Sequence, residues 1–239
     1  MYSAAIFDMD GTILDTLDDL RAAINYALEQ TGHRHNYSND LVRRFFGSGV
    51  TVAIQRALAT ESGFDLDRLE DIGDPDVTMK HPLPWDDEEV ARIQSIYKPY
   101  YDSHCDIHTG PYKGINEMIA SLKKAGVKTA VVSNKPDSAV QSLCNVHFNG
   151  IFDFALGEKE GIRRKPAPDM VETCIKTLEV RPEDCVYIGD SEVDIATAKS
   201  SNIPCISVDW GFRSHDYLTS RSADCIAATA DEVATFILK

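Results

Sequence analysis

The feature that most constrains the fold is a short apolar segment at residues 4–8 that has no strand-like neighbour nearby in the sequence. It ends at Asp8, and a helical pattern begins near Leu17 and continues, with interruptions, to about residue 95. A buried strand must pair its backbone N–H and C=O groups, and the next extended apolar segments follow residue 126. The sequence therefore predicts a discontinuous core, with a helical insertion between its first strand and its other strands.

The second half of the chain alternates between helix-like and strand-like segments. Strands that alternate with helices of about 10–12 residues favour parallel βαβ units with right-handed crossovers. A length of 239 residues suits one such core with a smaller addition. The expected helices are 114–125, 136–145, 168–178 and 192–201, and the expected strands are 127–132, 151–156, 185–188 and 203–208.

Polar residues suited to phosphate chemistry stand at the expected strand ends. Ligands of open parallel sheets bind at the carboxyl ends of the strands, so these residues are expected to meet at one edge. The four segments are Phe7-Asp8-Met9-Asp10-Gly11-Thr12, Ser133-Asn134-Lys135, Arg163-Arg164-Lys165 and Gly189-Asp190-Ser191 with Asp194.

The first segment carries two carboxylates, Asp8 and Asp10, separated by one residue. They point the same way if the two-residue period of the strand persists, and paired acids can hold a divalent cation. Gly11 permits a sharp exit of the chain, and the backbone or hydroxyl of Thr12 can donate to an oxyanion. Asp190 is a candidate third hard oxygen ligand, and Mg²⁺ prefers such sparse carboxylate sites, which leave room for water and phosphate.

The middle two segments are ambiguous when each is considered alone. Ser133 and Asn134 before a helix could form an anion site or an ordinary helix cap. Lys165 lies in a proline-rich loop, where its ammonium could neutralise a phosphoryl oxygen, although a solvated basic loop explains the same residues.

Taken together, the motifs resemble those of the haloacid dehalogenase superfamily of phosphotransferases, in the branch of phosphoglycolate phosphatases and β-phosphoglucomutases. The resemblance covers nearly the whole chain. It implies an α/β fold: a Rossmann-like parallel sheet with helices on both faces and an inserted all-helical cap domain. The implied core is residues 1–14 and 96–239, and the implied cap is residues 15–95.

The cap contains two further features. Gly47-Ser48-Gly49 follows a helix and not a strand, so it is a poor dinucleotide loop, and similar loops contact the substrate in the resembling family. Residues 73–85 contain Pro75, Pro82 and Pro84 and look like an enlargement of the usual cap. Because the cap supplies contacts to the leaving group in that family, this enlargement bears on the choice of substrate.

The resemblance also implies roles for the acidic residues. Asp8 resembles the nucleophile, which would attack phosphorus and form an aspartyl-phosphate. Asp10 resembles the general acid and base. Mg²⁺ would be held by Asp8, the carbonyl of Asp10, and Asp190.

The remaining residues of the motifs would hold the transferring phosphate. The family pattern gives this role to Ser133, Asn134 and Lys165, and Thr12 is a further donor. Asp194 would order Lys165 or a metal-bound water.

The predicted function is Mg²⁺-dependent hydrolysis of a small phosphomonoester, with phosphoglycolate as the best single guess. A sugar phosphate mutase of the β-phosphoglucomutase type is the main alternative, and a catalytically silent regulatory or binding module is a distant one. A dehalogenase would need neither a metal nor a second acid, so Asp10 and Asp190 argue against it.

Composition limits the partners and the compartment. Asp and Glu outnumber Lys and Arg by 38 to 24, giving a net charge of −14, which repels nucleic acid and anionic membranes. No apolar stretch approaches the ~20 residues of a membrane span, so a cytoplasmic location is expected. The expected oligomeric state is a monomer or a homodimer. His104 and His108 form a weak candidate zinc pair, and residues 210–213 are expected to make core or dimer contacts.

Overall fold

A computed structural model describes residues 1–74, 77 and 85–239. Most of the expected cap enlargement at 73–85 therefore lies outside the described residues. The chain divides into two compact units, which are described separately: Met1–Asp15 with Gly110–Lys239, and Thr16–Thr109. The expected boundary at residues 95 and 96 falls inside helix α4 (Asp87–His104).

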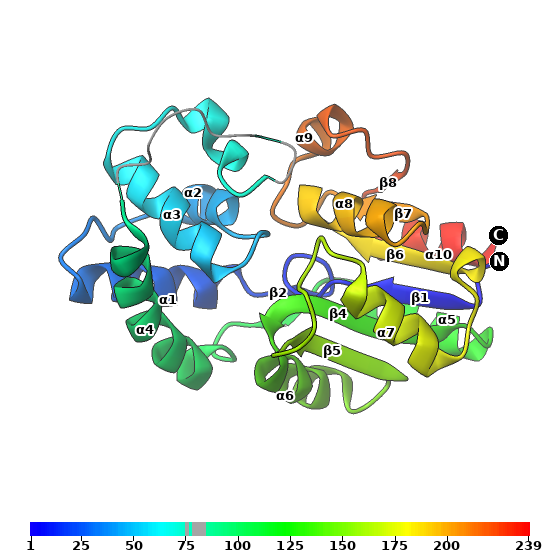
Figure 1. The fold of residues 1–239 in the computed structure, drawn as a ribbon. Helices are drawn as coiled ribbons and strands as arrows, with labels where there is room; N and C mark the ends of the chain where they lie inside the picture. Colours follow the sequence, from blue (N-terminus) through cyan, green and yellow to red (C-terminus); the bar gives the residue numbers. More distant parts are fainter. Residues whose placement is uncertain (75–76, 78–84) are drawn as a thin grey trace. The chain divides into compact units, whose positions relative to one another are not determined.

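The first unit is built on a six-stranded parallel sheet in the order β5-β4-β1-β6-β7-β8 (Figure 1). The central strand, β1 (Ala4–Phe7), pairs with β4 (Lys128–Pro136) on one side and β6 (Cys185–Gly189) on the other. The N-terminal strand thus finds its partners more than a hundred residues later, which confirms the predicted discontinuous core. The outer strands are β5 (Phe154–Glu158), β7 (Cys205–Val208) and β8 (Ile226–Ala227).

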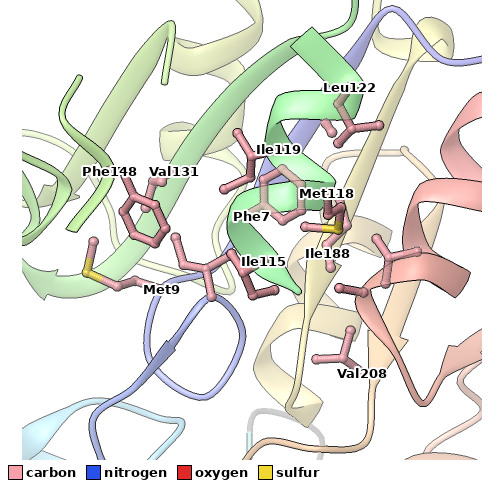
Figure 2. Packing of buried hydrophobic residues seen from close by; sticks show 14 of the residues in the cluster. Phe7, Met9, Ile115, Met118, Ile119, Leu122, Val131, Phe148, Ile188 and Val208 are labelled. Carbon is pink, nitrogen blue, oxygen red and sulfur yellow. The ribbon is translucent and has the colours of Figure 1, made fainter. Parts of the chain in front are cut away.

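Helices cover both faces of this sheet because its strands are apolar on both sides. Ala5 and Phe7 of β1 join one buried cluster, and Ala4 and Ile6 join the other. Figure 2 shows the first cluster, where Phe7 packs with a row of side chains from α5 (Ile115–Lys124). The first cluster also receives α6 (Asp137–Phe148) and α10 (Ala230–Leu238), and the second receives α7 (Asp169–Leu178) and α8 (Glu192–Ser200).

The topology places a switch point at β1. From β4 the chain moves outward to β5, then crosses to β6 on the opposite side of β1. Ligands of open α/β sheets bind in the crevice at such a point, beyond the carboxyl ends of the strands. The loops after β1, β4, β5 and β6 are therefore the place where the four motifs are expected to meet.

Two short strands and further short helices were not predicted. β2 (Leu14–Asp15) and β3 (Gly110–Pro111) form a small antiparallel ribbon where the chain leaves and re-enters the first unit. The additional helices are the 3₁₀ segments η1 (Leu66–Asp71) and η2 (Pro182–Asp184), and α9 (His215–Ser220).

The second unit is helical, as expected for a cap. Its main helices are α1 (Leu17–Gln30), α2 (Asn39–Phe45), α3 (Val50–Glu61) and α4. The buried carboxylate of Asp19 in α1 accepts hydrogen bonds from the backbone N–H groups of Ile107, His108 and Thr109. These bonds attach the segment after α4 to the helical unit, which explains why the unit extends to residue 109. No helix among the described residues has the length and apolarity that a bilayer crossing requires.

Candidate active site

Asp8 lies immediately after β1 and is 6% exposed. Its backbone N–H donates to the carbonyl of Ile188, which continues the pairing with β6. Its Oδ1 accepts from the backbone N–H of Met9 at 2.7 Å and lies 3.0 Å from Lys165 Nζ. Within the described parts of the chain, no donor is bonded to Oδ2. The carboxylate is thus held through one oxygen, and the other is left for a reactant or a cation.

The loop after Asp8 fixes the carboxylate of Asp190. Gly11 has φ +79°, and a Cβ added there would lie 2.4 Å from Asp190 Oδ2, so glycine is required on two grounds. Thr12 Oγ1 donates to Asp190 Oδ1 at 3.0 Å, and the Thr12 N–H donates to the carbonyl of Met9. Both donors of Thr12 have acceptors inside the site, and donation by Thr12 to an oxyanion remains a prediction.

Lys165 is a buried cation of the site, and its side chain is 1% exposed. Its ammonium contacts three oxygens: Asp194 Oδ1 at 2.8 Å, Tyr187 Oη at 2.9 Å and Asp8 Oδ1 at 3.0 Å. Burial lowers the pKa of Lys165, but the charges of Asp194 and Asp8 outweigh it and raise that pKa well above its usual value. The lysine is therefore a permanent cation beside the Asp8 carboxylate.

Asn134 supports Lys165 through the backbone. Its Oδ1 accepts from the Lys165 N–H at 2.8 Å, and its Nδ2 donates to the Lys165 carbonyl at 3.0 Å. This reciprocal pair fixes the loop that carries Lys165, and a contact of Asn134 with phosphate remains a prediction. Ser133 precedes it at the end of β4 and is 3% exposed.

Asp194 is fully committed to its neighbours. Its Oδ2 accepts from the N–H of Asp190 and from the N–H and hydroxyl of Ser191, completing a capping box at the start of α8. Its Oδ1 binds Lys165. Of the two expected roles, ordering Lys165 is the one these contacts support.

The acidic residues fit a divalent cation. Ligand atoms of Asp8, Asp190 and Asp194 lie within 4.8 Å of one another. Burial, together with repulsion from neighbouring carboxylates, raises the pKa of Asp8 to about 6 and raises that of Asp190 well above its usual value. A cation would relieve this repulsion, and clustered hard oxygens suit Mg²⁺. Because Asp194 already accepts four hydrogen bonds, Asp8 and Asp190 are the better-placed ligands.

A loop after β7 makes the core contacts expected for residues 210–213, since Trp210 packs against the first cluster and Phe212 is buried, and the same loop also braces the site. Trp210 Nε1 donates to the carbonyl of Thr12 at 3.0 Å, and the N–H of Phe212 donates to Asp190 Oδ2 at 2.7 Å. Between them, Gly211 lies against Asp190 so closely that a Cβ would stand 2.5 Å from the aspartate side chain. The spacing of these residues gave no signal, because their partners lie in remote motifs.

The weaker expectations have mixed outcomes. Helix α4 ends at His104, so His104 and His108 do not share a helical face, and His104 Nδ1 instead contacts the carbonyl of Tyr100. Gly47-Ser48-Gly49 joins α2 to α3, with positive φ at both glycines. Ser48 is buried and accepts from Arg56 Nη2 at 3.3 Å. A substrate contact by this loop remains a prediction.

Family comparison agrees with the site. The haloacid dehalogenase-like hydrolase family matches residues 5–208, a span that includes every residue of the predicted site. The chain belongs to this family.

Individual relatives sharpen the comparison. The phosphoglycolate phosphatase of Colwellia psychrerythraea is 29% identical over 208 residues, covering 87% of this chain and 84% of that protein. A crystal structure from Lactobacillus delbrueckii subsp. bulgaricus, described as a candidate phosphoglycolate phosphatase, is 53% identical with a TM-score of 0.95, covering 99% of this chain and 98% of that one. CbbY from Rhodobacter sphaeroides, solved with phosphate, is 23% identical with a TM-score of 0.71 over 98% of this chain and 96% of its own, a likeness of fold alone.

Proposed function

We propose that the protein is a Mg²⁺-dependent phosphatase that hydrolyses a small phosphomonoester through a phosphorylated Asp8. The observation that carries the proposal is the state of the Asp8 carboxylate. One of its oxygens is fixed by Met9 and Lys165, while the other has no hydrogen-bond donor among the described residues. A carboxylate held in this way is positioned and only half engaged, as a nucleophile requires.

In the first step, the Asp8 oxygen attacks phosphorus in line. A bond forms between this oxygen and phosphorus, and the bond from phosphorus to the leaving oxygen breaks. Asp10, two residues along the same loop, gives its proton to that leaving oxygen, so an alcohol departs. Lys165 beside Asp8 offsets negative charge on the transferring group.

In the second step, water opens the aspartyl-phosphate. The Asp10 carboxylate takes a proton from the water as the water oxygen attacks phosphorus. The bond to Asp8 then breaks, which restores both aspartates and releases inorganic phosphate. Asp8 and Asp190, with the Asp10 carbonyl, are the proposed holders of Mg²⁺, which when bound supplies charge neutralisation between carboxylate and phosphate.

The test is a phosphate-release screen over small phosphomonoesters, with Mg²⁺ and again with a chelator. We expect Mg²⁺-dependent release by the wild type and at least about 10⁴-fold loss in Asp8→Asn. The exposed Asp224 provides a matched control in Asp224→Asn, which should retain wild-type turnover. Substantial turnover by Asp8→Asn would overturn the assignment of the nucleophile.

The same screen addresses the substrate. Phosphoglycolate is the proposed substrate because several relatives carry that name, including the one from Colwellia psychrerythraea. If sugar phosphates are isomerised without release of phosphate, the mutase alternative replaces the phosphatase. Fast release from phosphoglycolate and slow release from bulkier esters would support the narrower assignment.

A further inference from the structure

Lys135 is a second buried lysine of the site, and the mechanism above does not use it. It lies near the end of β4, two residues after Ser133, and its side chain is 2% exposed. Its Nζ stands 2.7 Å from Asp10 Oδ1. Burying an ammonium is costly unless it is paired with good geometry, so this contact is a built feature of the site.

The backbone that carries Lys135 is fixed by the neighbouring strand. The register between β4 and β5 shifts between Val132 and Pro136, an irregularity of the kind that redirects side chains beside active sites. Gly157 of β5 lies against this stretch, where a Cβ would come 2.6 Å from the Lys135 carbonyl. The N–H of Gly157 also donates to Asp137 Oδ1 at 2.8 Å. The position of Lys135 is therefore set by the sheet and not by a free loop.

Each of the two buried lysines contacts one of the two N-terminal aspartates. Lys165 contacts Asp8, and Lys135 contacts Asp10. In the described part of the chain, Lys135 is the one donor bonded to the Asp10 side chain. The Asp10 side chain is 19% exposed, so without this contact solvent could support other rotamers of it.

We propose that Lys135 is a positioning residue, which holds the Asp10 carboxyl where it can exchange a proton with the leaving group. The proposal rests on the proposed phosphatase function. In this proposal Lys135 affects the rate at which the leaving group departs, and it does not affect how the phosphoryl group is bound. A misplacement of about 1 Å in such a group can cost on the order of 10²-fold in rate.

Two other roles would fit the same location. A purely structural lysine would affect folding and all substrates alike, and a lysine that binds phosphate would also affect all phosphomonoesters alike. A positioning role predicts a dependence on the leaving group. An alkyl ester needs a proton on its departing oxygen, whereas 4-nitrophenyl phosphate releases a stable phenolate and needs little assistance.

The experiment compares kcat/KM for these two kinds of ester in the full-length protein with Mg²⁺. This ratio covers the steps up to departure of the leaving group, so slow opening of the aspartyl-phosphate does not mask the effect. The variants are Lys135→Met, Lys135→Arg, Asp10→Asn and the double variant Lys135→Met with Asp10→Asn. Lys165→Met serves as the comparison, because loss of that cation should affect both esters similarly.

For Lys135→Met we expect a loss of about 10²-fold with the alkyl ester, at least about tenfold greater than the loss with 4-nitrophenyl phosphate. Lys135→Arg should recover part of the loss. In the Asp10→Asn background, removing Lys135 should have little further effect, because residues that act as a unit are not additive.

Equal losses with the two esters, or full additivity of the two substitutions, would overturn the positioning role while leaving the phosphatase assignment intact. Absence of phosphate release by the wild type would overturn both. The Asp8→Asn result separates the two cases, since it tests the nucleophile independently of Lys135.

Discussion

Buried charges occur in both units of the molecule, but their partners differ. In the first unit, Asp8 and Asp194 contact the ammonium of Lys165, and a carboxylate oxygen of Asp190 lies within 4.8 Å of one from each of them, so three carboxylates gather beside that ammonium. In the second unit, Arg56 is 0% exposed, and its hydrogen bonds include one to the Ser48 hydroxyl and others to the backbone carbonyls of Arg44, Phe45, Phe46, Glu70 and Ile72.

The difference teaches that burial of a charge does not by itself mark a reactive site. Carbonyl partners satisfy a cation and fix the backbone around it, which is a structural role. Burial, together with nearby like charges, raises the pKa of a carboxyl group such as that of Asp8, and this costs stability when the group is ionised. Proteins keep such an arrangement where it serves binding or chemistry.

The sharpest test of this contrast is Asp8→Asn, for which activity and stability should move in different directions. Turnover should fall by about 10⁴-fold or more. The free energy of unfolding without added metal should stay the same or rise, on the order of 1 kcal/mol, because the neutral amide removes one of the crowded charges. Its Oδ1 can still accept from Met9. Urea unfolding of the metal-free protein measures the effect, and a loss above about 2 kcal/mol would contradict the contrast.

The next largest effect is expected for Arg56→Met, which should act in the opposite sense to Asp8→Asn. It leaves several buried carbonyls without their donor, so the protein should lose about 3 kcal/mol of stability. Arg68→Met is the matched control, because the Arg68 side chain is 56% exposed and its pair with Asp71 contributes little. Equal midpoints of urea unfolding for the two variants would show that the buried Arg56 contributes no more to stability than the exposed Arg68.

Tyr187→Phe tests a buried group that could have both a structural role and a role in the reactive site. The hydroxyl of Tyr187 accepts from Lys165 and donates to the carbonyl of Val132 at 3.0 Å. Its loss should lower stability by about 1 kcal/mol and lower kcat/KM by about tenfold, because Lys165 loses one of three partners. The two measurements are urea unfolding and phosphate release. Unchanged kinetics would make Tyr187 structural only.

Much of the fold could be predicted because it follows from local patterns. Two patterns predicted the discontinuous parallel sheet. They are the alternation of helices and strands after residue 114 and the apolar segment at residues 4–8, which has no strand-like neighbour nearby in the sequence. Local patterns could not predict that the helical unit ends at residue 109, because this boundary depends on hydrogen bonds between Asp19 and the backbone of residues 107–109. The sequence carries no periodic signal for such a contact.

Sequence motifs predicted the residues of the candidate site and one contact between them, that of Asp194 with Lys165, but not their other partners. Asp8 and Asp190 directly follow strands, and Lys165 lies in the loop after β5, all beyond the carboxyl ends of strands, where a general rule points to ligands. The contacts of Tyr187 and Lys135 depend on which strands become neighbours and on a shift of register in β4. Trp210 reaches Thr12 across a sequence separation of 198 residues, which no local pattern reveals.

The smallest expected effect concerns charge near the surface of the helical unit. His33 contacts Glu61 at 2.7 Å and Glu89 at 2.5 Å, and Arg92 also binds Glu89. Although partial burial lowers it, hydrogen bonds to Glu89 and Glu61 raise the pKa of His33 above its usual value of 6.5. The protonated imidazole is therefore favoured in the folded state. It stabilises the protein fully below pH 6.5, and the contribution is lost as the pH rises through the higher folded pKa.

His33→Gln should consequently be less stable than the wild type at pH 5.5, by less than about 1 kcal/mol, and nearly equal to it at pH 9. The carboxylate partner Glu89 stays ionised over this range, because hydrogen bonds from Arg92 and His33 lower its pKa to about 2. His35→Gln is the matched control, since His35 is 48% exposed and lies 3.8 Å from Glu29. Urea unfolding at the two pH values measures the difference. A stability difference between wild type and His33→Gln that grows toward pH 9 would contradict the prediction. It would show that the folded protein favours the neutral imidazole of His33 over the charged one.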